Sequence, residues 1–426
     1  MSEYSQLDSA TYWGELPEKW QLVPIRYGFS LIGSGTTPPS GQERYYGGTV
    51  PWVTTSELRE NIIASTEKSV SELALNEFSS LKIYPPSSVL IAMYGATVGR
   101  VGTLGIPATV NQAVCVLAQP TIFEPKYTSY TLQASRNYLL SLTSGGGQPN
   151  LNAEKIIGHL LPCPPLSEQR AIATYLDRET AQLDALIAAK EELLILLAEK
   201  RRVTISESVT HGLSQSVLLR RVNIPWLDTI PENWKIERGR YLFNQSSLPT
   251  REEDEIVTCF RDGQVTLRRN RRTEGFTNAI KEVGYQGIRE GQLVLHSMDA
   301  FAGAIGVSDS DGKCTPEYII CDPINDNIYN SYYGYLLREM ALQGFIQASC
   351  PAVRERAPRI RFSDLKEMLL PVPPIGEQKA IVRYINKKIK IIDDLQNATK
   401  QTIALLNERR VALIAAAVSG QIRITE

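Results

Sequence analysis

The chain has 426 residues, of which 43% are apolar and 21% charged, and its 45 basic side chains nearly balance its 46 acidic ones. This is the composition of an ordinary globular protein whose length allows two to four domains, and the balanced charge argues against a broad, non-specific nucleic-acid binder. Because the N-terminus is polar and the uncharged apolar stretches are short, we expect neither a signal peptide nor a bilayer-spanning helix, and therefore a cytoplasmic protein.

Cysteine and histidine are too scattered to predict a metal site. The six cysteines form no C-x-x-C pair, and His159, His211 and His296 lie in three different regions. Cysteines in this pattern are typical of small buried side chains in a reducing compartment. We therefore expect no metal and no cofactor on this chain.

The first segment, residues 1–163, is rich in glycine, proline and β-branched residues, and its apolar runs are short. This pattern predicts strands separated by tight turns, and hence a mixed domain. The next segment, residues 164–213, has neither proline nor glycine from Ser167 to His211 and consists mainly of good helix formers. We expect one long helix there, with Ser167 as its N-cap and Gly212 in the left-handed C-terminal position.

The second half of the chain repeats this order. Residues 214–372 form a second predicted mixed domain, and residues 373–426 a second helical tail that ends near Gly420. Two motifs occur twice, namely P-P-x-x-E-Q at Pro164 and, 209 residues later, at Pro373, and P-E-x-W at Pro17 and at Pro231. The period is too long for a solenoid, so we predict two copies of one unit, each with a core of its own.

Apolar residues recur in alternating steps of three and four along both tails, which is typical of an amphipathic helix with one apolar stripe. Pairing the two stripes about a pseudo-two-fold axis predicts an antiparallel coiled coil. The alternative is that each helix packs separately on its own mixed domain. The residues predicted to pair are Ile172, Leu176, Leu183, Leu186, Leu193 and Leu197 in the first tail and Ile381, Ile385, Ile392, Leu395, Ile403 and Leu406 in the second.

The predicted fold class is therefore mixed α/β (α+β), with two mixed domains separated by two long paired helices and an internal duplication. Each tail of about 44 residues would reach roughly 65 Å at about 1.5 Å per residue. Such helices would act as a spacer between two domains. Duplex DNA is a natural partner, since two half-sites one helical turn apart lie about 34 Å from each other.

The same residues resemble a known family. The order L-P-E-x-W, mixed domain, P-P-L-S-E-Q-R-A-I-A-x-Y-L, the whole repeated, is similar to the DNA specificity subunit of type I restriction-modification systems, and the resemblance covers practically the entire chain. It implies that the mixed domains are target recognition domains for a bipartite, interrupted DNA sequence. It also implies that the paired tails hold two modification methyltransferase subunits, with restriction/translocase subunits joining later and S-adenosylmethionine and ATP bound only by these partners.

Candidate DNA contacts in the first half are polar: Thr36, Thr37, Tyr94, Arg100, Gln148 and Asn150. They lie in segments that look like ones common in the family, and Gln and Asn bind adenine through two hydrogen bonds. Tyr94 is equally well explained as a core aromatic, and Gln148 with Asn150 as the end of a turn. The second half departs from these segments, as two different half-sites would require.

In the second half the candidates are arginines, whose planar fork suits both phosphate and guanine. They form two clusters, Arg268, Arg269, Arg271 and Arg272, and Arg354, Arg356, Arg359 and Arg361. The alternative for each cluster is a solvated surface group with local carboxylate partners.

Motifs for catalysis are missing from the sequence. It has no D/N-P-P-Y/F motif for amino-methyl transfer, no G-x-x-x-x-G-K-[ST] loop, and no complete dinucleotide fingerprint. We therefore expect a non-catalytic subunit that chooses the DNA sequence on which its partners act. Two other classes stay open: a stand-alone enzyme of unfamiliar type, and a helical scaffold that joins protein partners without DNA.

Overall fold

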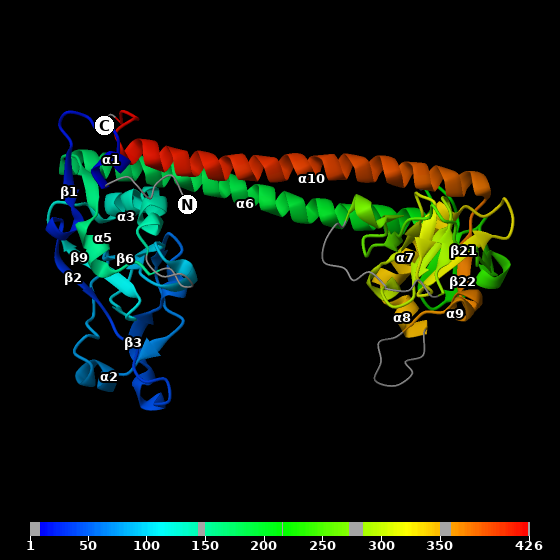
Figure 1. The fold of residues 1–426 in the computed structure, drawn as a ribbon, viewed down its shortest axis with the longest axis horizontal. Helices are drawn as coiled ribbons and strands as arrows, with labels where there is room; N and C mark the ends of the chain where they lie inside the picture. The colour runs from blue at the N-terminus through cyan, green and yellow to red at the C-terminus, as the bar shows by residue number, and fades with distance from the viewer. Residues whose placement is uncertain (1–8, 144–149, 215, 272–283, 350–358, 425–426) are drawn as a thin grey trace. The chain divides into compact units, whose positions relative to one another are not determined.

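The computed structural model describes residues 9–143, 150–214, 216–271, 284–349 and 359–424, and divides the chain into two compact units. Unit 1 comprises Met1–Glu191 with Lys400–Glu426, and unit 2 comprises Glu192–Thr399. Each unit therefore combines a mixed domain with part of both long helices, α6 (Leu166–His211) and α10 (Ile375–Val418) (Figure 1). No described helix is both long and apolar enough to cross a membrane.

The mixed domain of unit 1 is built on a five-stranded sheet with the order β2-β9-β6-β7-β4. Its strands are β2 (Phe29–Ser34), β9 (Val114–Pro120), β6 (Val89–Ala92), β7 (Val101–Leu104) and β4 (Asn61–Ile63). A smaller sheet has the order β5-β3-β8, and β1 pairs antiparallel with β10. These strands are β5 (Ser69–Val70), β3 (Tyr46–Val53), β8 (Thr109–Val110), β1 (Gln21–Pro24) and β10 (Leu160–Cys163).

Both faces of the central strand β6 are covered, which explains why its sequence is apolar throughout. Val89 and Ile91 belong to the core that includes the helical tails, and Leu90 and Ala92 to the core on the other face of the sheet. The shorter helices of this unit are α1 (Ser9–Tyr12), α2 (Glu72–Glu77), α3 (Pro125–Ala134), α4 (Arg136–Ser141) and α5 (Ala153–Gly158).

The mixed domain of unit 2 has a four-stranded sheet with the order β14-β21-β18-β19. Its strands are β14 (Phe243–Gln245), β21 (Tyr318–Pro323), β18 (Leu293–His296) and β19 (Ile305–Val307). The other strands pair as β11 (Leu219–Ile224) with β12 (Leu227–Pro231), β13 (Lys235–Arg238) with β22 (Leu369–Val372), β15 (Val257–Cys259) with β16 (Val265–Leu267), and β17 (Gln286–Ile288) with β20 (Gly312–Cys314).

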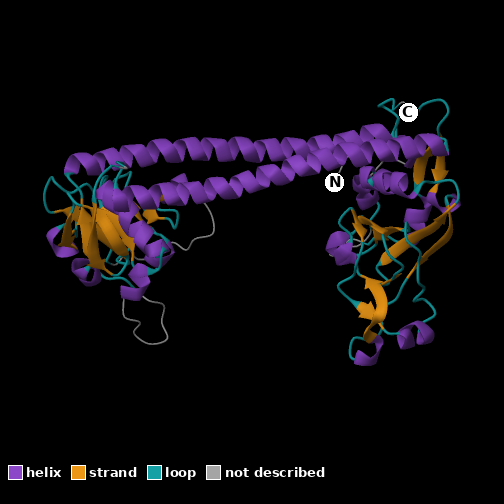
Figure 2. Ribbon diagram, turned by 180° about the vertical axis from the view of Figure 1, so that it is seen from behind, coloured by secondary structure: helices purple, strands orange, loops and turns teal. Residues whose placement is uncertain are grey.

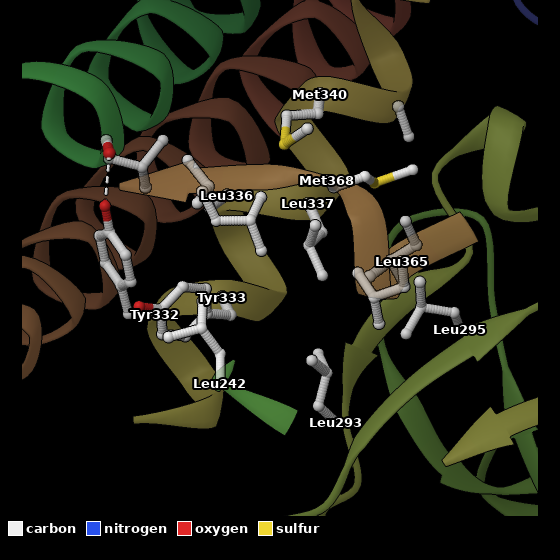
Figure 3. Packing of buried hydrophobic residues seen from close by; sticks show 14 of the residues in the cluster. Leu242, Leu293, Leu295, Tyr332, Tyr333, Leu336, Leu337, Met340, Leu365 and Met368 are labelled. Carbon is white, nitrogen blue, oxygen red and sulfur yellow. Dashed lines mark hydrogen bonds between the residues drawn. The ribbon is translucent and has the colours of Figure 1, made fainter. Parts of the chain in front are cut away.

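Helix α7 (Asn330–Leu342) contributes Tyr332, Leu336 and Met340 to the largest core of unit 2, which also contains Leu293 and Leu295 of strand β18 (Figure 3). Two short helices, α8 (Phe345–Ser349) and α9 (Phe362–Glu367), complete the unit. The strands of this unit, orange in Figure 2, are flanked by helices.

The two long helices pair antiparallel within each unit. In unit 1 the beginning of α6, with Ile172 and Leu176, shares a core with the end of α10, with Ile414 and Ala417. In unit 2 the end of α6 shares a core with the beginning of α10, as Ile205 and Val209 lie in the same cluster as Ile381 and Ile385. The predicted pairing of two similar stripes is confirmed, and the alternative of separate helices is wrong.

One ion pair joins the two helices in each unit. Arg410 Nε lies 3.0 Å from Asp184 Oδ1 in unit 1, and Arg201 Nη1 lies 2.8 Å from Asp393 Oδ1 in unit 2. Arg201 and Arg410, like Asp184 and Asp393, are separated by the 209 residues that separate the repeated motifs. The duplication therefore extends to the polar contacts of the helix pair.

Three of the twelve residues predicted to pair lie outside the buried seam. Leu186, Leu193 and Leu395 are 44%, 38% and 50% exposed, whereas the other nine are buried or half-buried. In the first helix, Ile187 and Leu194 are half-buried in place of Leu186 and Leu193, one position further along. Apolar residues stand next to each other at these two points, so that apolarity alone does not decide which of two neighbours faces the partner helix. Leu395 stands between Asp394 and Gln396 and has no such apolar neighbour.

The helix ends agree with the prediction at one terminus only. Gly212 and Gly420 follow the two helices with φ of 78° and 75°, the left-handed conformation that favours glycine. The N-cap prediction is wrong, because α6 begins at Leu166 and the carbonyl of Pro165 accepts the hydrogen bond from Gln169 N at 3.0 Å. Ser167 and Gly376 lie inside the first turn of their helices.

Candidate nucleic-acid interface

The two repeated motifs contact each other in both units. The indole Nε1 of Trp20 donates to Glu168 Oε2 at 3.2 Å, and that of Trp234 donates to Glu377 Oε2 at 3.0 Å. Each bond ties the tryptophan of P-E-x-W to the glutamate of P-P-x-x-E-Q. The motifs therefore fix the first turn of each long helix to the mixed domain that precedes it.

A fully buried glutamine completes this junction. Gln378 Nε2 donates to the carbonyls of Asn327 at 2.9 Å and Pro373 at 2.8 Å, and its Oε1 accepts from Tyr329 N at 2.9 Å. Gln169 makes the matching three bonds in unit 1, to the carbonyls of residues 122 and 164 and from the amide of residue 124. An amide side chain suits this place because it donates and accepts at once.

A tyrosine from each mixed domain holds the last turn of the other repeat's helix. Tyr127 donates to the carbonyl of Val418 at 3.3 Å in unit 1, and Tyr332 to that of Val209 at 2.7 Å in unit 2 (Figure 3). Burial raises the pKa of both phenols, so each keeps its proton and acts as a donor. These carbonyls belong to a helix C-terminus and have no partner further along the helix.

In the first mixed domain, the described candidate residues gather where neighbouring strands of the five-stranded sheet end, which we call the sheet edge. Thr36 and Thr37 follow β2, Tyr94 follows β6, and Arg100 precedes β7. These strand ends are adjacent because Ser34 pairs with Cys115 and Ala92 with Val114. Asn150 is brought to the same edge by an isolated bridge to Tyr94. The structure therefore unites residues that are more than 100 positions apart in the sequence.

The side chains at this edge are available to a ligand to different degrees. Tyr94 is 39% exposed and is thus not the core aromatic that the alternative reading proposed. The Thr37 hydroxyl donates to Gln112 Oε1, and the carbonyl of Thr36 accepts the Trp52 indole at 3.3 Å. Gln148 lies outside the described residues.

Sequence reasoning missed Asn111 and Gln112, which stand between β8 and β9 at this same edge. The signal was a pair of amide residues between two apolar strands. Asn111 Oδ1 accepts from Ala113 N at 3.1 Å and shapes the turn, and Gln112 contacts Thr37. Glycine is required at position 35, because an added Cβ would lie 1.6 Å from the carbonyl oxygen of Val110.

The second mixed domain repeats this edge with other residues. Ile360 N donates to the carbonyl of Ser297 at 3.0 Å, just as Leu151 N donates to that of Met93 at 2.9 Å in the first domain. The residues next to these anchors are therefore equivalent in place. Tyr94 and Asn150 in the first domain correspond to Met298 and Arg359 in the second.

The described arginines of the first cluster have local partners. Arg269 pairs with Glu255, and Arg271 Nη1 donates to both carboxylate oxygens of Asp262 at 2.9 and 2.7 Å. Arg268 Nε donates to Thr258 Oγ1 at 3.4 Å. Arg269 and Arg271 thus have the local carboxylate partners that are expected of a solvated surface group. Arg272 lies outside the described residues.

The second cluster borders a hollow of about 520 Å³ in unit 2. Its lining includes Gln245, Glu317, Tyr318, Arg359, Arg361 and Lys366. Arg359 Nη1 lies 3.2 Å from Glu317 Oε1, and the backbone N of Arg361 donates to Asp364 Oδ2 at 2.7 Å. Arg354 and Arg356 lie outside the described residues. In the described part of the chain, no group of histidine, cysteine or acidic residues is placed to hold a metal ion.

The α+β domain is duplicated, each copy has a different polar edge, and each is joined to a long helix by the same hydrogen bonds. These features define a two-domain recognition protein. The family model described as "Type I restriction modification DNA specificity domain" matches residues 17–195 and 268–405. The chain belongs to this family.

Curated relatives include the type I restriction enzyme EcoBI specificity subunit of Escherichia coli, 24% identical over 74% of this chain and 70% of that protein. The MjaIX specificity subunit of Methanocaldococcus jannaschii is 22% identical over 97% of this chain and 96% of that protein.

Solved structures share the fold. The HsdS subunit from Thermoanaerobacter tengcongensis aligns with a TM-score of 0.58 and 16% identity, over 96% of this chain and 98% of that one. A chain from a structure titled as describing complex assembly and conformational transition of the type I R-M system aligns with a TM-score of 0.65 and 17% identity, over 96% of this chain and all of that one.

Proposed function

We propose that this chain is the specificity subunit of a type I restriction-modification complex and that it reads a bipartite, interrupted DNA sequence. One mixed domain takes each half-site, with phosphate contacts for positioning and base contacts for selectivity. The observation that carries this proposal is the pair of equivalent sheet edges, which carry Tyr94 and Asn150 in one copy and Met298 and Arg359 in the other. One fold with two different edges suits an asymmetric target.

The chain itself selects the sequence and performs no chemistry in this proposal. Two modification methyltransferase subunits bind along the paired helices and bring S-adenosylmethionine, and restriction/translocase subunits bring ATP. Exposed apolar side chains on the helices, such as Leu193 and Leu395, are suited to contact with another protein.

Methylome sequencing of a host that expresses this chain with its partner subunits tests the proposal. We expect one methylated motif made of two defined parts and a gap of fixed length. Replacing residues 1–163 with the corresponding domain of another specificity subunit should change one part of the motif and leave the other unchanged. A continuous motif, or a replacement that alters both parts, would contradict the proposal.

Two controls separate it from other classes of protein. The isolated chain should show no saturable binding in an S-adenosylmethionine titration, whereas tight binding would indicate an enzyme. The assembled complex should retain duplex DNA that contains the motif. Assembly without DNA retention would indicate a scaffold.

A further inference from the structure

The hollow in unit 2 contains an arginine that is held in place by its neighbours. Glu317 Oε2 accepts from the Ser297 hydroxyl at 2.9 Å, and its Oε1 lies 3.2 Å from Arg359 Nη1. Arg359 Nη2 also lies 3.4 Å from the Met298 sulfur. A guanidinium carries five N–H groups, so these two contacts leave three without a partner among the described residues. The fork is oriented before any ligand arrives.

The charge around this arginine favours nucleic acid. Arg359, Arg361 and Lys366 border the hollow together with one carboxylate, Glu317. Among the described side chains, Arg361 and Lys366 have no carboxylate partner, in contrast to the ion-paired Arg269 and Arg271. An excess of cations beside an oriented fork suits a base edge flanked by phosphates.

The comparison between the two domains indicates what kind of contact this place makes. Contacts with a structural role keep their residues in both copies, as with Gln169 and Gln378. Met298 and Arg359 replace Tyr94 and Asn150 at an equivalent and exposed place. Asparagine suits adenine, and arginine suits the O6 and N7 acceptors of guanine.

We propose that Arg359, backed by Met298 and oriented by Glu317, reads a guanine in the half-site of the second mixed domain. This inference rests on the proposed function and deepens it, since it names a specificity-determining residue and the base that it selects. Glu317 acts as a positioning residue, because its carboxylate contacts the guanidinium of Arg359 and both side chains line the hollow.

The experiment measures methylation by the assembled complex on a library of sites that covers every base at each position of the wild-type motif. The wild-type complex should require guanine at one position of the second half-site. Arg359→Gln should lower the preference for that guanine by roughly 10- to 100-fold, as expected for a lost bidentate base contact, and leave the first half-site unchanged. Arg359→Lys should also lose this preference, because lysine keeps the charge but lacks the fork.

Arg251→Gln is the matched control. Arg251 is 53% exposed and lies 3.2 Å from a carboxylate oxygen of Asp311, and Arg359 is 54% exposed with an ion pair of the same length. The control should leave the motif unchanged. Glu317→Gln should weaken the guanine preference less than Arg359→Gln does, and the melting temperature of each variant should stay within a few degrees of the wild type.

Three outcomes would overturn the inference. The motif could be unchanged in Arg359→Gln, or Arg359→Gln could lose base preference equally at all positions. Alternatively, Arg359→Lys could lose overall affinity and keep the preference for guanine. Each can occur while the domain replacement still changes only one half-site, which would leave the proposed function standing. A wild-type complex without a two-part motif would instead contradict the proposed function itself.

Discussion

Replacing Gln378 with leucine tests whether the repeated P-P-x-x-E-Q motif is a structural lock. The side chain is fully buried and makes three hydrogen bonds of 2.8 to 2.9 Å to backbone groups. Leucine has a similar size but neither donates nor accepts. The substitution would leave two carbonyls and one amide buried without partners, at the point where α10 leaves the mixed domain.

The magnitude follows from these three groups. Each lost bond costs about 1 kcal/mol, and a backbone group left buried without a partner costs about 1 to 3 kcal/mol. Three such groups therefore predict a loss of about 3 to 9 kcal/mol in the free energy of unfolding, a large part of the about 5 to 15 kcal/mol of a typical protein. Gln169→Leu should cost a similar amount in unit 1, because it makes the same three bonds.

Urea unfolding followed by circular dichroism and tryptophan fluorescence measures the effect. Lys379→Leu is the control, since this neighbour is exposed on the same helical turn, and it should change the free energy of unfolding by less than about 0.5 kcal/mol. If Gln378→Leu proves no more destabilising than Lys379→Leu, the motif has no structural role and a contact with a partner protein becomes the better explanation.

Two further predictions concern titration and the helix pair. His159 is buried between Trp13 and Tyr138, and burial lowers its pKa to about 3, below the unfolded value of about 6.5. The stability that neutral His159 contributes is complete above pH 6.5 and is lost as pH falls toward 3. We expect the free energy of unfolding to fall by about 2 kcal/mol between pH 7 and pH 5, and the urea midpoint to fall with it. A fall of the same size in His159→Phe would refute this. For the helix pair, a double-mutant cycle of Arg201→Ala and Asp393→Ala should give a coupling of about 0.5 kcal/mol that disappears in 1 M salt, since both side chains are 41% exposed; no coupling at low salt would contradict the assigned ion pair.

The sequence predicts the duplicated architecture and the long helices because both depend on local signals. Prolines, helix formers and the terminal glycines lie next to one another in the chain, and Gly212 and Gly420 adopt the predicted left-handed conformation. The side of the helix that faces its partner is harder to predict. Leu193 and Leu194 have the same chemistry, and only three-dimensional packing decides that the second is the more buried.

The candidate interface is predictable in composition but not in arrangement. The sequence singles out Tyr94 and Asn150, yet only the strand order β2-β9-β6-β7 brings them together with Thr37 at one edge. It also singles out Arg359 as one of eight arginines. Arg359 pairs with a carboxylate, as Arg269 and Arg271 do. Its contact with Met298 and its place in the lining of the hollow distinguish it from them, and neither can be read from the sequence.

Duplication makes the division of labour between residues visible within one chain. At the junction of helix and domain, both copies keep the same side chain, as with Trp20 and Trp234, and each makes a buried contact that needs its chemistry. At the sheet edge the copies differ although the backbone bonds beside them are the same. A place where the fold is kept but the exposed side chain changes is free of structural demands, so its residues can follow the DNA sequence that each copy reads.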